Sequence, residues 1–371
     1  MKLNATYIKI RDKWWGLPLF LPSLILPIFA HINTFAHISS GEVFLFYLPL
    51  ALMISMMMFF SWAALPGIAL GIFVRKYAEL GFYETLSLTA NFIIIIILCW
   101  GGYRVFTPRR NNVSHGDSRL ISQRLFWQIV FPATLFLILF QFAAFVGLLA
   151  SRENLVGVMP FNLGTLINYQ ALLVGNLIGV PLCYFIIRVV RNPFYLRSYY
   201  SQLKQQVDAK VTKKEFAIWL LALGALLLLL CMPLNEKSTI FSTNYTLSLL
   251  LPLMMWGAMR YGYKLISLLW AVVLMISIHS YQNYIPIYPG YTTQLTITSS
   301  SYLVFSFIVN YMAVLATRQR AVVRRIQRLA YVDPVVHLPN VRALNRALRD
   351  APWSALCYLP VSYTHLRAHE T

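Results

Sequence analysis

The sequence predicts an all-α polytopic membrane protein of about ten transmembrane helices, followed by the truncated start of an α/β domain. Hydrophobic residues make up 58% of the chain and charged residues 12%, whereas soluble domains carry roughly 25% charged residues. The apolar residues come in blocks long enough to cross a bilayer. The last block, residues 301–317, runs without a helix breaker into an arginine cluster, which is typical of a helix that leaves the membrane on the cytoplasmic side.

A transmembrane helix needs roughly 20 apolar residues, and ten segments of the chain fit this pattern or approach it. From the N-terminus they are residues 14–32, 43–60, 62–74, 85–100, 125–150, 163–190, 216–234, 245–259, 265–279 and 301–317. Residues 43–60 and 62–74 are expected to lie as a closely apposed pair. Residues 31–42 are poor in basic side chains and residues 281–298 have no charge, so both are expected to be outer loops.

The distribution of basic residues predicts the orientation. Residues 101–124 hold five arginines against one aspartate, and residues 188–215 carry seven basic residues. Basic loops stay in the cytoplasm, so both of these loops and both chain termini are expected there.

Arg75 and Lys76 are the exception, because this scheme puts them on the outer side. They are expected to pair with Glu79 and Glu84 near the membrane interface. The alternative is that residues 43–74 form a re-entrant hairpin.

Residues 163–190 carry small and polar side chains at helical spacing on one face. They are Gly164, Asn168, Ala171, Gly175 and Gly179. Small residues let helix backbones approach closely, and an asparagine can form a hydrogen bond across the contact. We interpret this face as a helix packing seam. The alternative is a polar ligand site that includes Asn176.

Composition and motifs exclude several functions. There is no nucleophile elbow, phosphate loop, HExxH or paired-carboxylate motif, and the chain has only 12 acidic residues. No catalytic residue, metal ligand or cofactor is therefore expected in this chain. The net charge of +19 lies mostly in the loops that set topology, so the expected partner is the lipid bilayer and not nucleic acid.

The segment after the last span carries a short heptad pattern. Leu315, Val322 and Leu329 recur every seven residues, with Ile326 between the last two. Such a seam predicts a two-heptad coiled coil and hence a homodimer. A firm assignment needs three or four heptads, so an ordinary juxtamembrane helix with an arginine-rich face is an equal alternative.

Residues 329–340, LAYVDPVVHLPN, resemble the opening of a GGDEF domain, whose usual pattern is LAxxDxLTGLxNR. Asp333, Leu338 and Asn340 match that pattern, whereas residues 335–337 depart from its Leu-Thr-Gly. Residues 341–348 then resemble the first helix of that domain, and its first strand follows. The departures imply a degenerate domain that does not make cyclic di-GMP.

The membrane part is similar to the membrane-associated sensor (MASE) family. Residues 174–181, VGNLIGVP, and the P…W…RxG pattern of residues 251–262 carry this resemblance. Nearly the whole chain thus resembles the N-terminal part of a bacterial membrane-anchored cyclic-di-GMP phosphodiesterase. The family order is a MASE sensor, a degenerate GGDEF domain and a catalytic EAL domain. The resemblance implies the inner membrane, an unknown sensory ligand, and Mg²⁺ or Mn²⁺ only in the EAL domain of full-length relatives.

The expected organisation follows from these motifs. Residues 1–317 form the sensory membrane domain, 318–330 a juxtamembrane signalling helix and 331–359 the start of the GGDEF domain, while 360–371 resemble read-through of a vector sequence. The expected function is the sensory and anchoring region of a cyclic-di-GMP signalling protein. The alternative is a polytopic transporter for a small solute, which a weak internal repeat favours. No catalytic residue of the family falls within the chain, so whether this chain is itself an enzyme stays open.

Overall fold

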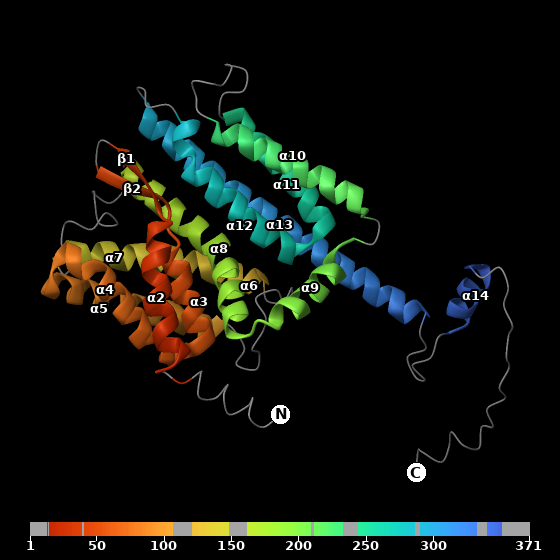
Figure 1. Cartoon of the computed structure of the whole chain (residues 1–371), viewed down its shortest axis with the longest axis horizontal. Coiled ribbons are helices and arrows are strands. Elements are labelled where there is room, and N and C mark those ends of the chain that lie inside the picture. The colour runs from red at the N-terminus through yellow and green to blue at the C-terminus, as the bar shows by residue number, and fades with distance from the viewer. Residues whose placement is uncertain are drawn as a thin grey trace, which may run out of the picture. The chain divides into compact units, whose positions relative to one another are not determined.

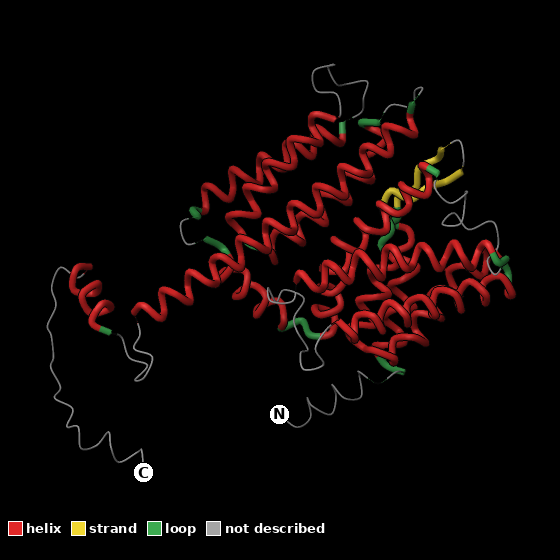
Figure 2. The backbone as a smooth tube through the Cα atoms, turned by 180° about the vertical axis from the view of Figure 1, so that it is seen from behind, coloured by secondary structure: helices red, strands yellow, loops and turns green. Residues whose placement is uncertain are grey.

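The computed structural model describes residues 13, 15–38, 41–106, 121–147, 162–208, 211–232, 244–285, 290–331 and 340–350. They belong to two compact units, residues 1–318 and residues 319–371, which are described separately. The described part of the first unit is a bundle of helices that carries a small β-hairpin (Figure 1, Figure 2). The predicted helical membrane class is confirmed at this level.

Helices make up most of the described chain. Their bounds are α2 (Leu17–His31), α3 (Pro49–Phe60), α4 (Leu65–Leu80), α5 (Phe82–Phe106), α6 (Ile121–Gln128), α7 (Phe136–Phe145), α8 (Leu163–Arg191), α9 (Tyr195–Gln206), α10 (Lys213–Cys231), α11 (Asn244–Tyr261), α12 (Tyr263–His279), α13 (Tyr291–Tyr331) and α14 (Val341–Asp350). Shorter helical turns are η1 (Ser61–Ala64), the π-helical η2 (Ile129–Leu135) and η5 (Tyr281–Asn283). The strands are β1 (Thr34–Ile38) and β2 (Gly41–Phe46).

Within the described residues, six helical segments are long and apolar enough to cross a membrane. They are Pro49–Leu80, Phe82–Val105, Leu125–Phe145, Leu163–Arg191, Lys213–Cys231 and Tyr291–Ile326. The apolar helices α2 and α12 are shorter. With 15 and 17 residues and a rise of ~1.5 Å per residue, these two helices are shorter than a hydrocarbon core of ~30 Å. The six long segments confirm the prediction of a multi-pass membrane protein. The count of about ten spans stays a prediction.

The hairpin corrects the sequence-based assignment of the first outer loop and the second span. β1 and β2 pair antiparallel with His37 opposite Glu42. Residues 43–46 therefore belong to a strand, and the helix begins only at Pro49, where a proline suits the first helical position. A short apolar run does not distinguish a strand from a helix, which is why the strand was missed.

Helix α13 corrects a second assignment, because it begins at Tyr291 inside the expected outer loop. In the Thr- and Ser-rich start of this helix, the hydroxyl groups find hydrogen-bond acceptors in carbonyl groups one turn earlier. Thr296 Oγ1 donates to the carbonyl oxygen of Thr292 at 2.7 Å, and Ser300 Oγ donates to that of Thr296 at 2.8 Å. The helix has 41 residues, a length of about 60 Å.

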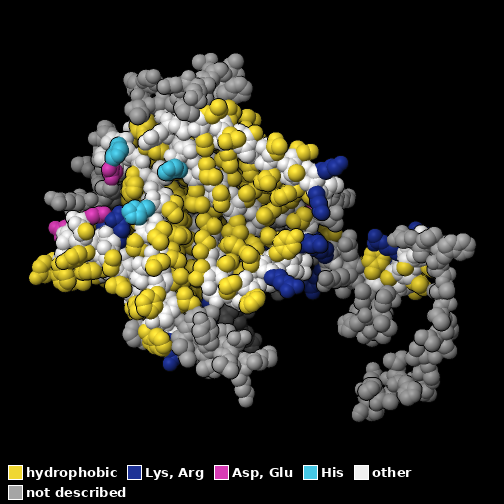
Figure 3. All heavy atoms as spheres, in the orientation of Figure 1, with side chains coloured by type: hydrophobic (Ala, Val, Ile, Leu, Met, Phe, Trp, Pro, Cys, Tyr) yellow, Lys and Arg dark blue, Asp and Glu magenta, His cyan; other side chains and the backbone are white. Residues whose placement is uncertain are grey.

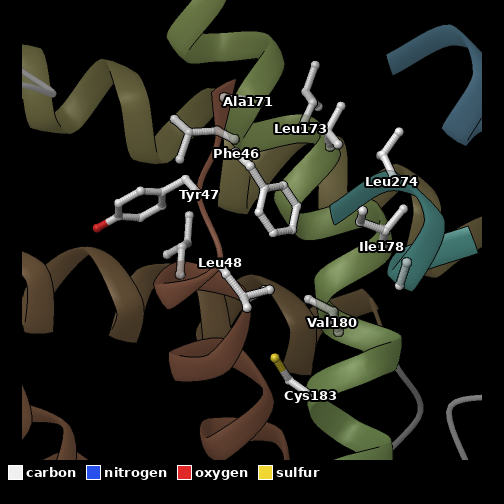
Figure 4. Close-up of a cluster of buried hydrophobic side chains, with 14 of the residues drawn as sticks. Phe46, Tyr47, Leu48, Ala171, Leu173, Ile178, Val180, Cys183 and Leu274 are labelled. Atoms are coloured by element: carbon white, nitrogen blue, oxygen red, sulfur yellow. The ribbon is translucent and has the colours of Figure 1, made fainter. Parts of the chain in front are cut away.

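The end of β2 and the residue that follows it, Tyr47, run through the core of the first unit. Phe46 points toward Ile178 on α8 and toward Leu274 on α12, whereas the ring of the next residue, Tyr47, points the opposite way (Figure 4). Phe46 is almost completely buried. Alternate residues of this extended stretch therefore face different parts of the molecule, as the pleat of a strand requires.

The surface of the bundle agrees with a membrane location. Figure 3 shows one face covered by a broad area of apolar side chains, with acidic and histidine side chains gathered near one end of it. A soluble monomer rarely exposes an apolar area of that extent. This face is consistent with contact to lipid.

Candidate functional site

The small residues predicted as a seam on α8 lie against the β2–α3 segment and the start of α3. A Cβ atom on Gly175 would lie 2.2 Å from the carbonyl oxygen of Tyr47. A Cβ atom on Gly179 would lie 2.8 Å from Cβ of Ala51. Gly164 is buried near the start of the helix. The neighbour of Gly175 is an extended backbone, so the expectation of a contact between two helices is wrong at that position.

Asn168, the polar member of this face, binds the hairpin. Its Oδ1 accepts a hydrogen bond of 2.8 Å from the backbone N–H of Phe44. This N–H group would otherwise be a buried donor without a partner, which is unfavourable. Asn176 Nδ2 instead donates to the carbonyl oxygen of Leu172 on its own helix, at 2.8 Å. A ligand site at Asn176 stays a prediction.

Helix α13 is hydrogen-bonded to its neighbours through its polar face. Gln170 Nε2 on α8 donates to Ser300 Oγ at 2.7 Å. The indole Nε1 of Trp270 on α12 donates to Ser306 Oγ at 3.0 Å. Hydrogen bonds between membrane helices contribute about 0.6 kcal/mol on average. Together they define the axial position of α13 relative to α8 and α12.

A second set of contacts holds α13 near residue 317; we call it the turn junction. The backbone N–H of Tyr263 donates to Thr317 Oγ1 at 3.0 Å. The next backbone N–H, that of Lys264, donates to Gln206 Oε1 at 3.1 Å. Tyr199 Oη donates to the carbonyl oxygen of Lys264 at 2.9 Å. The turn thus connects α9, α12 and α13 one residue before the arginine cluster begins.

A glycine, a pair of ionic contacts and a buried hydroxyl group stabilise this conformation of the turn junction. Gly262 has a φ of +81°, which favours glycine. Arg260 lies 3.4 Å from a carboxylate oxygen of Asp208 and 3.7 Å from one of Glu215. Burial raises the pKa of the Tyr199 hydroxyl, so this group remains a neutral donor. These residues include the RxG pattern that the sequence analysis matched to the sensor family.

A cavity of about 260 Å³ lies beside the hairpin; we call it the hairpin cavity. Its walls come from α2, the hairpin, α3, α4 and α5. The lining residues are Leu26, Ala30, Asn33, Phe35, Phe44, Tyr47, Pro49, Met53, Ile72, Arg75, Lys76, Glu79, Leu88 and Phe92. The sequence pattern did not indicate this cavity, because its lining residues are spread along the chain from Leu26 to Phe92.

The charged wall of the hairpin cavity is the cluster that the sequence placed outside the basic-loop pattern. Arg75 Nη1 donates to Glu79 Oε1, and Lys76 Nζ donates to Glu79 Oε2 at 2.9 Å. The expected pairing of both cations with Glu79 is confirmed. Glu84 lies in the first turn of α5.

The predicted stalk residues expose apolar surface where the structure describes them. Leu315 is 47% exposed, Val322 57% and Ile326 60%. The side chain of Leu329 lies outside the described residues. This exposure agrees with a surface that pairs with a second protomer and also with a helix surface in contact with lipid. The homodimer therefore stays a prediction.

In the second unit, Asn340 links two helices, and Asp333 and Leu338 lie outside the described residues. The backbone N–H of Asn340 donates to the carbonyl oxygen of Tyr331 at 2.9 Å, and its Nδ2 donates to that of Ala330 at 2.8 Å. Its Oδ1 accepts from the N–H of Ala343 at 3.1 Å, as an N-cap does. One residue thereby closes the end of α13 and starts α14.

In the part of the chain that the structure describes, no group of three or more His, Cys, Asp or Glu side chains could hold a metal ion. Among the described residues, the hairpin cavity and the turn junction are the candidate functional sites, because both bring charged or hydrogen-bonding side chains from several helices together. They lie beside opposite ends of α8, since the hairpin contacts Asn168 near its start and α9 follows its end (Figure 1).

Comparison with known proteins gives consistent matches. The MASE1 family model matches residues 15–320. The chain is 99% identical to the cyclic di-GMP phosphodiesterase PdeF of Escherichia coli (strain K12) over 361 residues, which cover 97% of this chain and 48% of PdeF. It is 24% identical to the probable cyclic di-GMP phosphodiesterase PdeA of the same strain over 359 residues, which cover 94% of this chain and 48% of PdeA.

The chain spans about half the length of these curated relatives. No solved structure matches it.

Proposed function

Because the chain belongs to the MASE1 family, we propose that residues 1–317 form the membrane sensory and anchoring region of a protein that acts in cyclic di-GMP signalling. Both curated relatives have cyclic di-GMP phosphodiesterase in their names. In this proposal, hydrolysis belongs to an EAL domain that uses Mg²⁺ or Mn²⁺ and lies outside this chain. Residues 331–359 are the start of a degenerate GGDEF domain between the two.

The observation that carries the proposal is the binding of one long helix at two levels. Helix α13 is hydrogen-bonded at Ser300 and Ser306 to α8 and α12, and at Thr317 to the turn junction. It then continues to Tyr331 without a break. A change in packing among the other helices therefore alters the balance between positions of α13, and the helix carries that shift to its C-terminal end.

We further propose that the protein lies in the bacterial inner membrane with about ten spans and both termini in the cytoplasm. The basic residues of α9 and of the start of α10 support this orientation, because basic loops are retained in the cytoplasm. In this orientation the turn junction is cytoplasmic and the hairpin cavity faces the opposite side. The exposed residues Leu315, Val322 and Ile326 support pairing of two protomers along the stalk.

A matched pair of threonine substitutions tests the signalling role of α13. Thr317 and Thr296 both donate to the carbonyl group one turn earlier, at 2.7 Å, but Thr317 also accepts the hydrogen bond from Tyr263. The substitutions are made in residues 1–331 followed by the whole PdeF sequence from the position aligned with residue 332 onward, and hydrolysis of cyclic di-GMP is measured in native membranes. Thr317→Val should change the rate about twofold or more, whereas Thr296→Val should not. Rates unchanged in both variants would contradict the proposal.

A further inference from the structure

The hairpin cavity combines an aromatic interior with a charged wall. Phe35, Phe44, Tyr47 and Phe92 contribute rings from separate parts of the chain. The ring centroids of Phe35 and Phe44 lie 4.7 Å apart, and those of Phe44 and Tyr47 lie 5.0 Å apart. Ring pairs at such distances attract each other, and a further ring can join them. Ligand pockets likewise combine apolar and aromatic walls with placed polar groups.

The charged wall presents two cations to the cavity. Arg75 Nη1 and Lys76 Nζ both bind the carboxylate of Glu79. Counted by themselves, these three side chains carry a formal net charge of +1. Such a wall suits a ligand that carries an anionic group.

Arg75 also has an unused hydrogen-bond donor. Its Nε is buried and has no hydrogen-bond partner among the described residues, while Nη1 binds Glu79. A buried N–H of a charged group without a partner is unfavourable. The Nε edge of a guanidinium group offers two parallel donors, which fit the two oxygens of a carboxylate.

We propose that the hairpin cavity binds a small monocarboxylate that carries an aromatic or aliphatic group. The carboxylate lies on the Nε edge of Arg75, and the apolar group lies among the rings of Phe35, Phe44 and Phe92. A volume of about 260 Å³ is just below the ~300–1,000 Å³ of typical ligand pockets, which favours a short acid. A fatty acid released from the bilayer shares this chemistry and is distinguished by experiment.

The site has a contact route to the output helix. Phe44 and Tyr47 line the cavity and also touch α8, through Asn168 and Gly175. On α8, Gln170 in turn donates a hydrogen bond to Ser300 of α13. As a signal input, the site rests on the proposed sensory function; as a binding site, it does not.

Binding is measured directly, so that the result is independent of signalling. The whole chain is purified in a neutral maltoside detergent, and the dissociation constant of 3-phenylpropionate is measured by calorimetry. Separate titrations use its uncharged amide and palmitate. We expect saturable binding of the short acid and at least about tenfold weaker binding of the amide. Binding of palmitate alone, with the same dependence on Arg75, would assign the carboxylate to a lipid source.

Two substitutions in the cavity should act in opposite directions. Arg75→Gln removes the two parallel donors of the guanidinium group and should weaken binding about tenfold or more. Glu79→Gln removes the carboxylate that competes for Arg75 and Lys76, so it should tighten binding. Arg104→Gln is the control, since Arg104 binds Ser61 at the far end of α5. Arg75→Lys keeps the positive charge without the paired donors, so this variant should bind the short acid with intermediate affinity.

Three results would overturn the inference. Unchanged affinity in Arg75→Gln, equal binding of acid and amide, or no saturable binding of either acid at millimolar concentration would each exclude a carboxylate site. Thermal unfolding of each variant without ligand identifies loss of folding. If Arg75→Gln fails to fold, the opposite result expected for Glu79→Gln still decides the question.

Discussion

The side-chain Oδ1 of Asn168 accepts a hydrogen bond from the backbone N–H of Phe44, 124 residues earlier in the chain. This contact attaches the hairpin to the central helix α8. Because Phe44 also lines the hairpin cavity, the bond fixes one wall of that cavity relative to the bundle. The contact thus connects a structural element to a candidate ligand site.

Removing the Asn168 side chain should destabilise the hairpin. Asn168→Leu leaves the buried N–H of Phe44 without its acceptor, which costs about 1–3 kcal/mol. The matched control is Asn91→Leu on α5, whose Nδ2 donates to the carbonyl oxygen of Ser87 on its own helix. The thermal midpoint of the detergent-solubilised chain should fall clearly in the first variant. Equal midpoints would show that the bond contributes nothing measurable.

Adding a methyl group at Gly175 should be unfavourable. The new Cβ in Gly175→Ala would lie 2.2 Å from the carbonyl oxygen of Tyr47, so α8 or the extended segment must move, at about 1–3 kcal/mol. Gly224→Ala on α10 is the control, because its Cβ meets nothing within 4 Å. Alanine favours helix over glycine by up to ~1 kcal/mol, so this variant should be equal or more stable. A loss of stability in both would refute the specific contact.

The stalk should pair along its apolar residues. In a variant without the native cysteines, Val322→Cys should cross-link between protomers in native membranes. Arg324→Cys, turned away from the seam, should cross-link much less. Arginines on the two helices repel each other, and anionic headgroups screen that repulsion. Equal cross-linking at both positions, or none at position 322, would leave an unpaired juxtamembrane helix.

The two ends of α8 should differ in access from outside the cell. His37 has a side chain that is 79% exposed in the hairpin, and Gln205 is exposed on α9. In intact cells, an impermeant maleimide should label His37→Cys and leave Gln205→Cys unlabelled, because basic loops are cytoplasmic. Both should react after the cells are opened. Labelling of Gln205→Cys in intact cells would reverse the proposed orientation.

The sequence predicted those elements whose pattern is long and periodic. Residues 163–190 were assigned as one span, and α8 runs from Leu163 to Arg191. The small-residue face was also located, although its neighbour at Gly175 is an extended segment. The hairpin was not predicted, because residues 43–46 are apolar on both sides of the chain and carry no alternation. The start of α13 was missed because Thr and Ser indicate loops in water, whereas here their hydroxyl groups bond within the helix.

The candidate sites depended on information that a single sequence does not contain. Arg75 and Lys76 were noticed as charges outside the topological pattern, but nothing in their spacing indicated that rings from the hairpin and α5 lie beside them. Thr317 was equally inconspicuous at the end of an apolar run. Its role depends on the backbone of Tyr263, 54 positions earlier. Contacts made by backbone atoms leave no signature in the residue types, so this contact could not be predicted from the sequence.

The unbroken helix from Tyr291 to Tyr331 also restricts how the chain can vary in length. Each residue inserted into an α-helix turns everything after it by about 100° and moves it ~1.5 Å along the axis. An insertion of seven residues returns a seam nearly to its original direction, with a drift of ~20°. An insertion of two directs the seam to the opposite side. Under the proposed pairing of the stalk, relatives that signal in the same way should therefore differ in length after residue 318 by whole heptads, and insertions of other lengths should alter which helix face pairs.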